Sequence, residues 1–196
     1  MKIIMTKTYH KTRYNDSWMY ILLLSTLVIL VESLKTYYFT LFDVNITYSI
    51  FLLPVIYGVT NYITTKYGFR RTLLGIGISL VSVLAFILLM NFAIGKELDI
   101  ASLSGGLVGY TISQLVNTLI YKFLTVNTDR PYLLILLNYI FAYIVFYMLY
   151  TVVHMNLIVA ATFWIGYFTS IAIQSLMSIV IALFIKKVKL GMSKDD

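Results

Sequence analysis

The sequence contains no cysteine and only two histidines. Without cysteine the chain can form no disulfide, no thiolate nucleophile and no cysteine-based zinc site. His10 lies near the N-terminus and His154 at the edge of an apolar run, so no histidine is expected inside a membrane span. A Walker A loop and a cluster of aspartates within the apolar runs are also missing. We therefore expect neither an enzyme nor a bound cofactor.

Charged residues are also scarce. They make up 12% of the 196 residues, about half the usual share in a soluble domain. In contrast, 60% of the residues are hydrophobic, and the mean hydropathy is +0.88. A soluble protein of this composition would have too little polar surface to cover its core. The composition predicts an integral membrane protein whose main surroundings are the lipid bilayer.

The apolar residues fall into long runs. About 20 residues of helix span the ~30 Å hydrocarbon core of a bilayer. By this measure the sequence predicts an all-α six-transmembrane-helix bundle over residues 18–185, flanked by basic tails at 1–17 and 186–196. The first run is too long for a signal-peptide core and is expected to remain as the first helix. The predicted helices are 18–38, 47–65, 72–94, 103–123, 132–153 and 158–185.

Basic residues are distributed unequally between the two sides that six spans would create. Four lie in the N-terminal tail, three after the second span, two after the fourth and four in the C-terminal tail. The opposite side has only Lys35 and Lys96. Because positive residues concentrate on the cytoplasmic side, this distribution predicts that both termini are cytoplasmic, in the plasma membrane. The net charge of +7 thus reflects topology, and no nucleic-acid partner is expected.

One acidic side chain, Glu32, lies well inside a predicted span. Lys35 follows three residues later on the same helix face, where the two can pair. Two interpretations are open. The pair lies on the surface with Lys35 reaching the lipid headgroups, or it forms a charged contact at the mouth of a cavity that opens to the outside.

Polar side chains also follow a helical stripe in the second span, where Tyr57, Asn61 and Thr65 are spaced four residues apart. Lipid cannot satisfy such groups, so the stripe is expected to face other helices. It could line a substrate cavity, or it could hold helices together by hydrogen bonds. Large amides in other spans favour a neutral, hydrogen-bonding ligand such as a nucleobase-like compound. The expected substrate-binding residues are Tyr57, Asn61, Thr65, Gln114, Asn117, Asn138 and Glu32.

Glycine and proline add three local expectations. Pro54 is expected to kink the second helix. Gly68 is expected to end that helix in a left-handed conformation. Gly105 and Gly109 form a G-x-x-x-G spacing that allows close approach of another helix.

The segment LPVIYGVTNYITTKYGFRR, residues 53–71, resembles the vitamin-uptake-like family of six-span proteins, which includes the bacterial queuosine precursor transporters. That family shows a phrase similar to F-P-L-T-Y-x-x-S-D-x-x-T-E-x-Y-G-Y-K-R-A. A second match is Ser113-Gln114-Leu115 followed by Asn117, against S-Q-x-x-D. The sequence departs from the family where Asn61, Thr65 and Asn117 stand in place of intramembrane acids.

The resemblance implies a six-span fold and uptake of a small heterocyclic molecule, such as a queuosine precursor or a related nucleobase-like or vitamin-like compound. The family is similar in fold to the substrate-binding subunits of energy-coupling-factor transporters, which dock an energising membrane subunit through an A-x-x-x-A pattern in helix one. The segment LLLSTLVILVESL lacks this pattern, so an energising partner stays an open expectation. The alternative function is a non-transporting membrane subunit of a larger complex, which the loss of the family's acids suggests.

Overall fold

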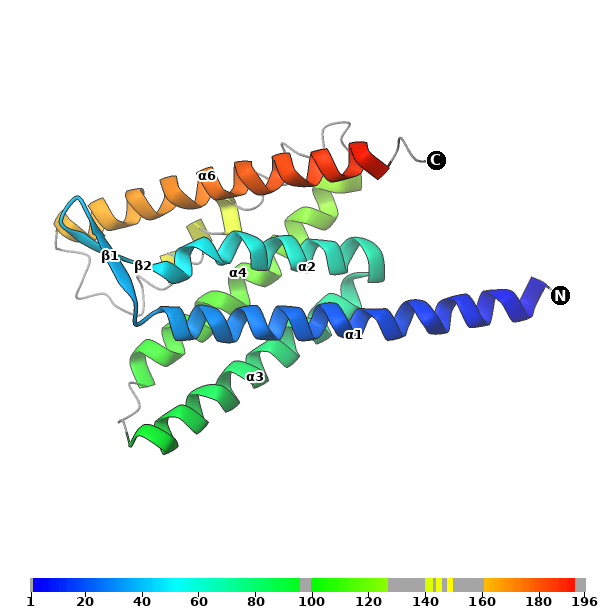
Figure 1. Cartoon of the computed structure of the whole chain (residues 1–196), viewed down its shortest axis with the longest axis horizontal. Helices are drawn as coiled ribbons and strands as arrows, with labels where there is room; N and C mark the ends of the chain where they lie inside the picture. Colours follow the sequence, from blue (N-terminus) through cyan, green and yellow to red (C-terminus); the bar gives the residue numbers. More distant parts are fainter. Residues whose placement is uncertain are drawn as a thin grey trace.

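The computed structural model describes residues 2–95, 100–126 and 161–192, together with positions 140–142, 144–145 and 148–149. This part of the chain is mostly helical, as the apolar runs predict (Figure 1). The elements in chain order are helix α1 (Lys2–Leu34), strands β1 (Tyr38–Leu41) and β2 (Val44–Thr47), the 3₁₀ helix η1 (Tyr48–Phe51), and helices α2 (Leu53–Tyr67), α3 (Phe69–Ile94), α4 (Ile100–Val126) and α6 (Ala161–Met192).

Helix α1 is longer than the predicted span 18–38 at its start and shorter at its end. It includes most of the predicted basic tail, because residues 2–34 contain neither proline nor glycine to interrupt it. It ends at Leu34, and the four predicted helical residues after it form a turn and the start of β1. The part from Asp16 to Leu34 is apolar and long enough to cross a membrane.

A β-hairpin follows α1, which the sequence analysis did not predict. Strands β1 and β2 pair antiparallel, with Tyr38 opposite Thr47 and Leu41 opposite Val44. The two loop residues, Phe42 and Asp43, have φ angles of 52° and 58°. Positive φ at both positions is the requirement of a type I′ turn, which Asn and Gly usually meet. A side chain other than Gly costs roughly 1–2 kcal/mol in this region, so the loop is strained.

Helix α2 covers most of the predicted span 47–65. The first turn of that span is the separate 3₁₀ helix η1. Pro54 lies in the first turn of α2, where its missing N–H has no helical acceptor. The expected kink at Pro54 is therefore wrong, and the proline begins the helix instead. The 15 residues of α2 are about 22 Å long, and η1 adds about 8 Å. Together they match the ~30 Å hydrocarbon core.

A single residue, Gly68, joins α2 to α3. Its φ of 88° confirms that the position requires glycine, but its ψ of 166° lies far from the left-handed helical region that the sequence suggested. This combination of angles is essentially restricted to glycine. Across the turn, the hydroxyls of Thr64 and Thr72 lie 3.0 Å apart and fix the two helices in place.

Helices α3, α4 and α6 lie where the third, fourth and sixth runs predicted helices at 72–94, 103–123 and 158–185, each extending a few residues further. The fifth predicted helix, 132–153, lies mostly outside the described residues, although the described positions between 140 and 149 are helical. In the described part, three helices are long and apolar enough to cross a membrane, at Asp16–Leu34, Phe69–Ile94 and Trp164–Ile181.

The helices run in two opposite directions. Helices α2, α4 and α6 run towards the end of the bundle where α1 begins, and α1 and α3 run away from it (Figure 1). The start of α1, the turn at Gly68 and the C-terminal ends of α4 and α6 therefore lie at the same end, which we call the basic end. The hairpin and the start of α6 lie at the opposite end, which we call the hairpin end.

Cations at the basic end lie over aromatic rings. The Nζ of Lys66 is 5.4–5.5 Å from the centroids of three tyrosine rings, and it donates a hydrogen bond to the hydroxyl of Tyr62 at 3.1 Å. Such pairs are typical of residues that anchor a helix at the level of the headgroups. The pairs are Lys66 with Tyr20, Tyr62 and Tyr67, Arg71 with Trp18, and Lys122 with Phe69.

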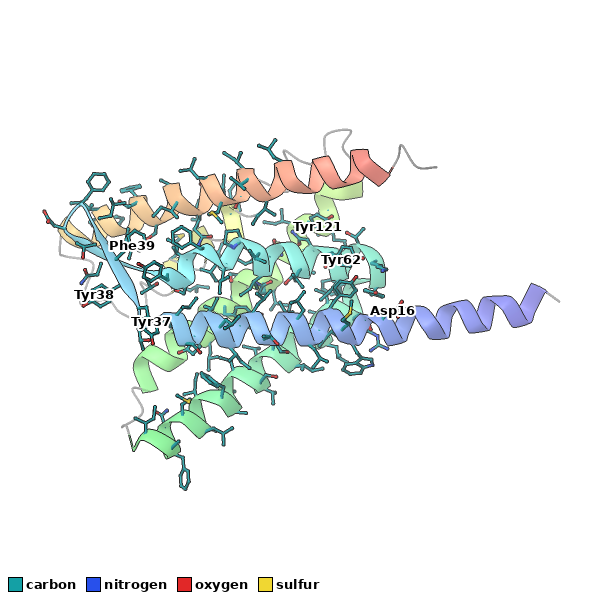
Figure 2. All side chains as sticks on the ribbon, in the orientation of Figure 1. Asp16, Tyr37, Tyr38, Phe39, Tyr62 and Tyr121 are labelled. Carbon is teal, nitrogen blue, oxygen red and sulfur yellow. The ribbon has the colours of Figure 1, made fainter. Side chains whose placement is uncertain are left out.

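Figure 2 places aromatic residues at both ends of the bundle. Tyr62 and Tyr121 lie towards the basic end, where Asp16 is also found, whereas Tyr37, Tyr38 and Phe39 lie at the hairpin end. Two aromatic zones separated by apolar helices are typical of a protein that spans a bilayer.

Helices pack closely around Gly75 on α3. A Cβ atom at this position would lie 3.3 Å from Cγ1 of Ile21 and 3.6 Å from Cδ2 of Leu24, both on α1. It would also lie 4.0 Å from Cδ1 of Ile63 on α2. Gly75 therefore lets α3 approach both neighbours. The close approach expected at Gly105 and Gly109 stays a prediction.

We expect Gly75→Leu to destabilise the protein by about 1–3 kcal/mol, because the new side chain must displace Ile21 and Leu24. Gly77→Leu is the matched control, since no atom lies within 4 Å of a Cβ at that position on the same helix. Both changes raise helix propensity equally, so the difference between them isolates packing. Thermal unfolding of the purified variants measures it. Equal stability of the two variants would contradict the packing described here.

Candidate functional site

Helices α2 and α4 face each other through a ladder of polar side chains. Tyr57, Asn61 and Thr65 on α2 lie opposite Ser113, Asn117 and Tyr121 on α4. Every rung joins residues that are 56 positions apart in the sequence. A constant offset requires two helices that run in the same direction, in register, with one side chain per turn on the shared face.

The middle rung is a reciprocal pair of amides. Nδ2 of Asn117 donates to Oδ1 of Asn61 at 2.9 Å, and Nδ2 of Asn61 donates to Oδ1 of Asn117 at 3.4 Å. Both side chains are buried. The pair therefore links the two helices by two hydrogen bonds.

The other two rungs are formed by hydroxyl groups. Tyr57 lies opposite Ser113, whose hydroxyl donates to the carbonyl oxygen of Tyr110 at 2.9 Å, and this tyrosine is among the largest fully buried side chains of the described chain. At the basic end, the hydroxyls of Thr65 and Tyr121 lie 3.0 Å apart. The stripe that the sequence predicted on α2 is thus used, at least in part, to hold α2 against α4.

Threonines beside this stripe are satisfied within their own helix. Oγ1 of Thr60 donates to the carbonyl oxygen of Ile56 at 2.9 Å, and Oγ1 of Thr64 donates to that of Thr60 at 2.9 Å. Such bonds to the residue four positions earlier are common for threonine in apolar surroundings. These hydroxyls already have an acceptor and contribute less to a ligand site than the amides do.

Gln114 lies beside the ladder on α4. It follows Ser113 on α4 and has 0% of its side chain surface exposed. Both of its polar atoms, Nε2 and Oε1, are buried, and neither has a hydrogen-bond partner among the residues that the structure describes. A buried polar group without a partner costs about 1–3 kcal/mol, and such groups are rare in native proteins. Gln114 therefore has a buried donor and a buried acceptor that an additional molecule could satisfy.

Gln174 on α6 is a second buried glutamine with the opposite arrangement. Its Nε2 donates to the backbone carbonyl of Ile50 in η1, which ties α6 to the segment before α2. Ser170 and Ser178 lie one turn before and one turn after it, and both are buried. The resulting polar stripe on α6 was missed by the sequence analysis, although its four-residue spacing could have revealed it.

Glu32 does not join the other predicted site residues. Its carboxylate pairs with Nζ of Lys35 at 2.5 Å, near the hairpin end of α1. Nζ of Lys35 in turn lies 3.1 Å from the point where a Cβ would stand at Gly106 on α4. Gln114 is eight residues further along α4, about 12 Å away at 1.5 Å per residue. The pair thus touches α4 two turns from the amides.

Of the predicted site residues, the structure brings together Tyr57, Asn61, Thr65, Gln114 and Asn117. Asn138 lies outside the described residues. The partners Ser113 and Tyr121 were not predicted, because a single sequence does not give the register between two helices. Among the described residues there is no group of three or more His, Cys, Asp or Glu side chains that could hold a metal ion.

A further polar contact links α4 to α3, where the hydroxyls of Ser79 and Tyr110 lie 3.0 Å apart. Both residues are buried, and Tyr110 belongs to the apolar core formed by α1, α2 and α3. Helix α4 is therefore fixed by hydrogen bonds on two sides, to α2 and to α3, and this fixes the position of Gln114.

No family profile, no curated protein and no solved structure matches this chain. A proposal for its function therefore rests on the sequence and on the geometry of the site.

Proposed function

We propose that this chain is a plasma-membrane transporter that takes up a small neutral heterocyclic molecule, such as a queuosine precursor or a related nucleobase-like or vitamin-like compound. The observation that carries the proposal is the buried amide of Gln114 with both polar atoms unpaired. A bound molecule that presents one donor and one acceptor would satisfy both atoms at once.

The uncharged character of the site supports a neutral ligand. The side chains of the ladder are amides and hydroxyls, and the carboxylate of Glu32 is already paired with Lys35. A charged ligand in this position would be removed from water without an opposite charge nearby, which is strongly unfavourable. The ring of Tyr57 is buried in an apolar cluster with Leu53 and Ala142, so the surroundings of the ladder are apolar.

The proposed topology has six spans with both termini in the cytoplasm. The start of α1, the turn at Gly68 and the end of α6 lie at one end of the bundle, which supports this topology (Figure 1). The absence of cysteine allows a direct test, because each introduced cysteine is unique. We expect Thr36→Cys to react with a membrane-impermeant maleimide in intact cells, and Ser193→Cys to react only after the cells are permeabilised. The reverse pattern would exclude this orientation.

Thermal stability of the detergent-purified protein tests the proposed ligand class. We expect one member of a panel of deazaguanines, nucleobases and water-soluble vitamins to raise the unfolding temperature. A compound present at 100 times its dissociation constant adds about 2.7 kcal/mol to the free energy of unfolding. A shift with a compound outside these classes would keep the site and replace the substrate.

If no compound stabilises the protein and a second protein copurifies in stoichiometric amount, the alternative of a non-transporting membrane subunit gains support. In that case the polar faces of the helices would serve contacts between subunits. An energising membrane subunit would be distinguished from such a partner by ATP-dependent uptake in the presence of both proteins.

A further inference from the structure

The tip of the β-hairpin exposes aromatic side chains. Phe42 has 71% of its surface exposed, and Tyr37 and Tyr38 have 63% and 59%. On the other face of the hairpin, the ring of Phe39 packs against Tyr48 and Phe51, with centroids 5.4 and 6.0 Å apart. The ring of Phe39 is thus packed against the protein. The rings at the tip and base of the hairpin are exposed.

The backbone at the tip makes this exposure unusual. Phe42 and Asp43 both have positive φ, a conformation that glycine and asparagine adopt without strain. A bulky aromatic residue is strained here, and the fold gives its ring little contact in return. Strain kept at an exposed position suggests that the side chain contacts something outside the folded chain.

The location of the hairpin indicates what the side chain of Phe42 contacts. It connects the apolar end of α1 at Leu34 to η1 and α2, and β2 packs against α6 near the start of the membrane-length segment Trp164–Ile181. Each strand has four residues, about 13 Å in length, so the tip stays close to the ends of the helices. It therefore lies near the level of the lipid headgroups at the hairpin end (Figure 1).

The hairpin carries almost no charge, so we expect it to contact lipid through apolar surface rather than through ion pairs. Between Lys35 and Lys66 the sequence contains no basic residue, and Asp43 is the single acidic one. An anionic headgroup would find no positive partner on the hairpin. Aromatic rings with few charges are the residues that prefer the boundary between headgroups and acyl chains.

We propose that the β1–β2 hairpin is a membrane-interface anchor, whose tip inserts the ring of Phe42 among the lipids of the leaflet at the hairpin end. The anchor holds the strained turn against the bilayer and fixes the hairpin between α1 and α6. It acts independently of the proposed transport function, since it requires the membrane and no substrate.

A fluorescent probe tests this directly. The variant Phe42→Cys is labelled with an environment-sensitive fluorophore and reconstituted in phosphatidylcholine vesicles, and Asn45→Cys on the same hairpin is the matched control. We expect the emission of the probe at position 42 to shift to shorter wavelength, to be quenched by lipids that carry a quencher on the acyl chain, and to resist quenching by aqueous iodide. The control is expected to show weaker lipid quenching and stronger iodide quenching.

Addition of anionic lipid or salt is expected to leave the signal at position 42 unchanged. Full iodide quenching at position 42, equal to that of the control, would refute insertion. Lipid protection that appears only at high protein density would assign the tip to a second copy of the chain instead, and would also refute it. If the labelled variant does not fold, Phe42→Trp provides the same test, because brominated lipids would then quench more emission than in the wild type with Trp18 and Trp164 alone.

Discussion

Replacing Gln114 by leucine is expected to stabilise the unliganded protein and to abolish its response to ligand. Leucine has nearly the same size and removes two buried polar atoms that have no partner. Removing that penalty raises the free energy of unfolding by about 1–3 kcal/mol. The same change deletes the donor and the acceptor that we assign to the substrate, so function and stability move in opposite directions.

The matched control is Gln174→Leu, the same substitution at a second buried glutamine. Because Gln174 donates to the carbonyl of Ile50, its loss leaves a buried carbonyl unpaired and is expected to cost about 1–3 kcal/mol. Thermal unfolding of both variants, with and without the compound panel, separates the two roles. If Gln114→Leu is as destabilising as Gln174→Leu, the amide of Gln114 has a structural partner and our assignment of the site is wrong.

The second large effect is expected at the amide pair. Asn61→Leu removes two hydrogen bonds from the buried amide of Asn117, and Asn117→Leu removes the same two from the buried amide of Asn61. Each single variant is expected to lose about 1–3 kcal/mol. The double variant Asn61→Leu/Asn117→Leu replaces both amides by apolar groups of similar shape and is expected to be more stable than the sum of the two losses implies.

A double-mutant cycle measures this coupling from the unfolding free energies of the wild type and the three variants. Hydrogen bonds between membrane helices give coupling energies of about 0.6 kcal/mol on average and up to about 1.7 kcal/mol. We expect the upper part of this range, because the two amides exchange two hydrogen bonds. Strict additivity would show that the amides do not interact in the membrane, and the register of α2 against α4 would have to be revised.

The helical segments were predictable because their signal is strong and local. A run of about 20 apolar residues has few alternatives to a helix in a bilayer, since the backbone must satisfy its own hydrogen bonds there. The boundaries were less certain. Helix α1 continued back to Lys2 because nothing in its sequence stops a helix, and it ended at Leu34 because residues 38–47 pair as strands.

The hairpin escaped prediction because its turn lacks the usual sequence signal. Asn-Gly or Asp-Gly between alternating residues indicates a type I′ hairpin, whereas this chain has Phe42-Asp43. Pro54 was misread for a related reason. The sequence did not reveal that the first turn of the second span is 3₁₀, which places the proline at the start of α2 rather than in its interior.

The candidate site was predictable on each helix separately and not between helices. Spacing by four residues correctly placed Tyr57, Asn61 and Thr65 on one face of α2, and identified Gln114 and Asn117 as buried amides of α4. The offset of 56 residues that pairs the two helices depends on tertiary packing. The unpaired state of Gln114 likewise depends on which side chains surround it, which a single sequence does not specify.

The most direct test of the central claim is accumulation of substrate by living cells. Cells that express the wild type, Gln114→Leu or no protein are given a mixture of deazaguanines, nucleobases and water-soluble vitamins, and their contents are measured by mass spectrometry. We predict that one neutral heterocycle accumulates with the wild type and not with Gln114→Leu, although both proteins reach the membrane in equal amount. Equal accumulation in all three kinds of cell would contradict the assignment of Gln114 as the substrate-binding residue of an uptake transporter.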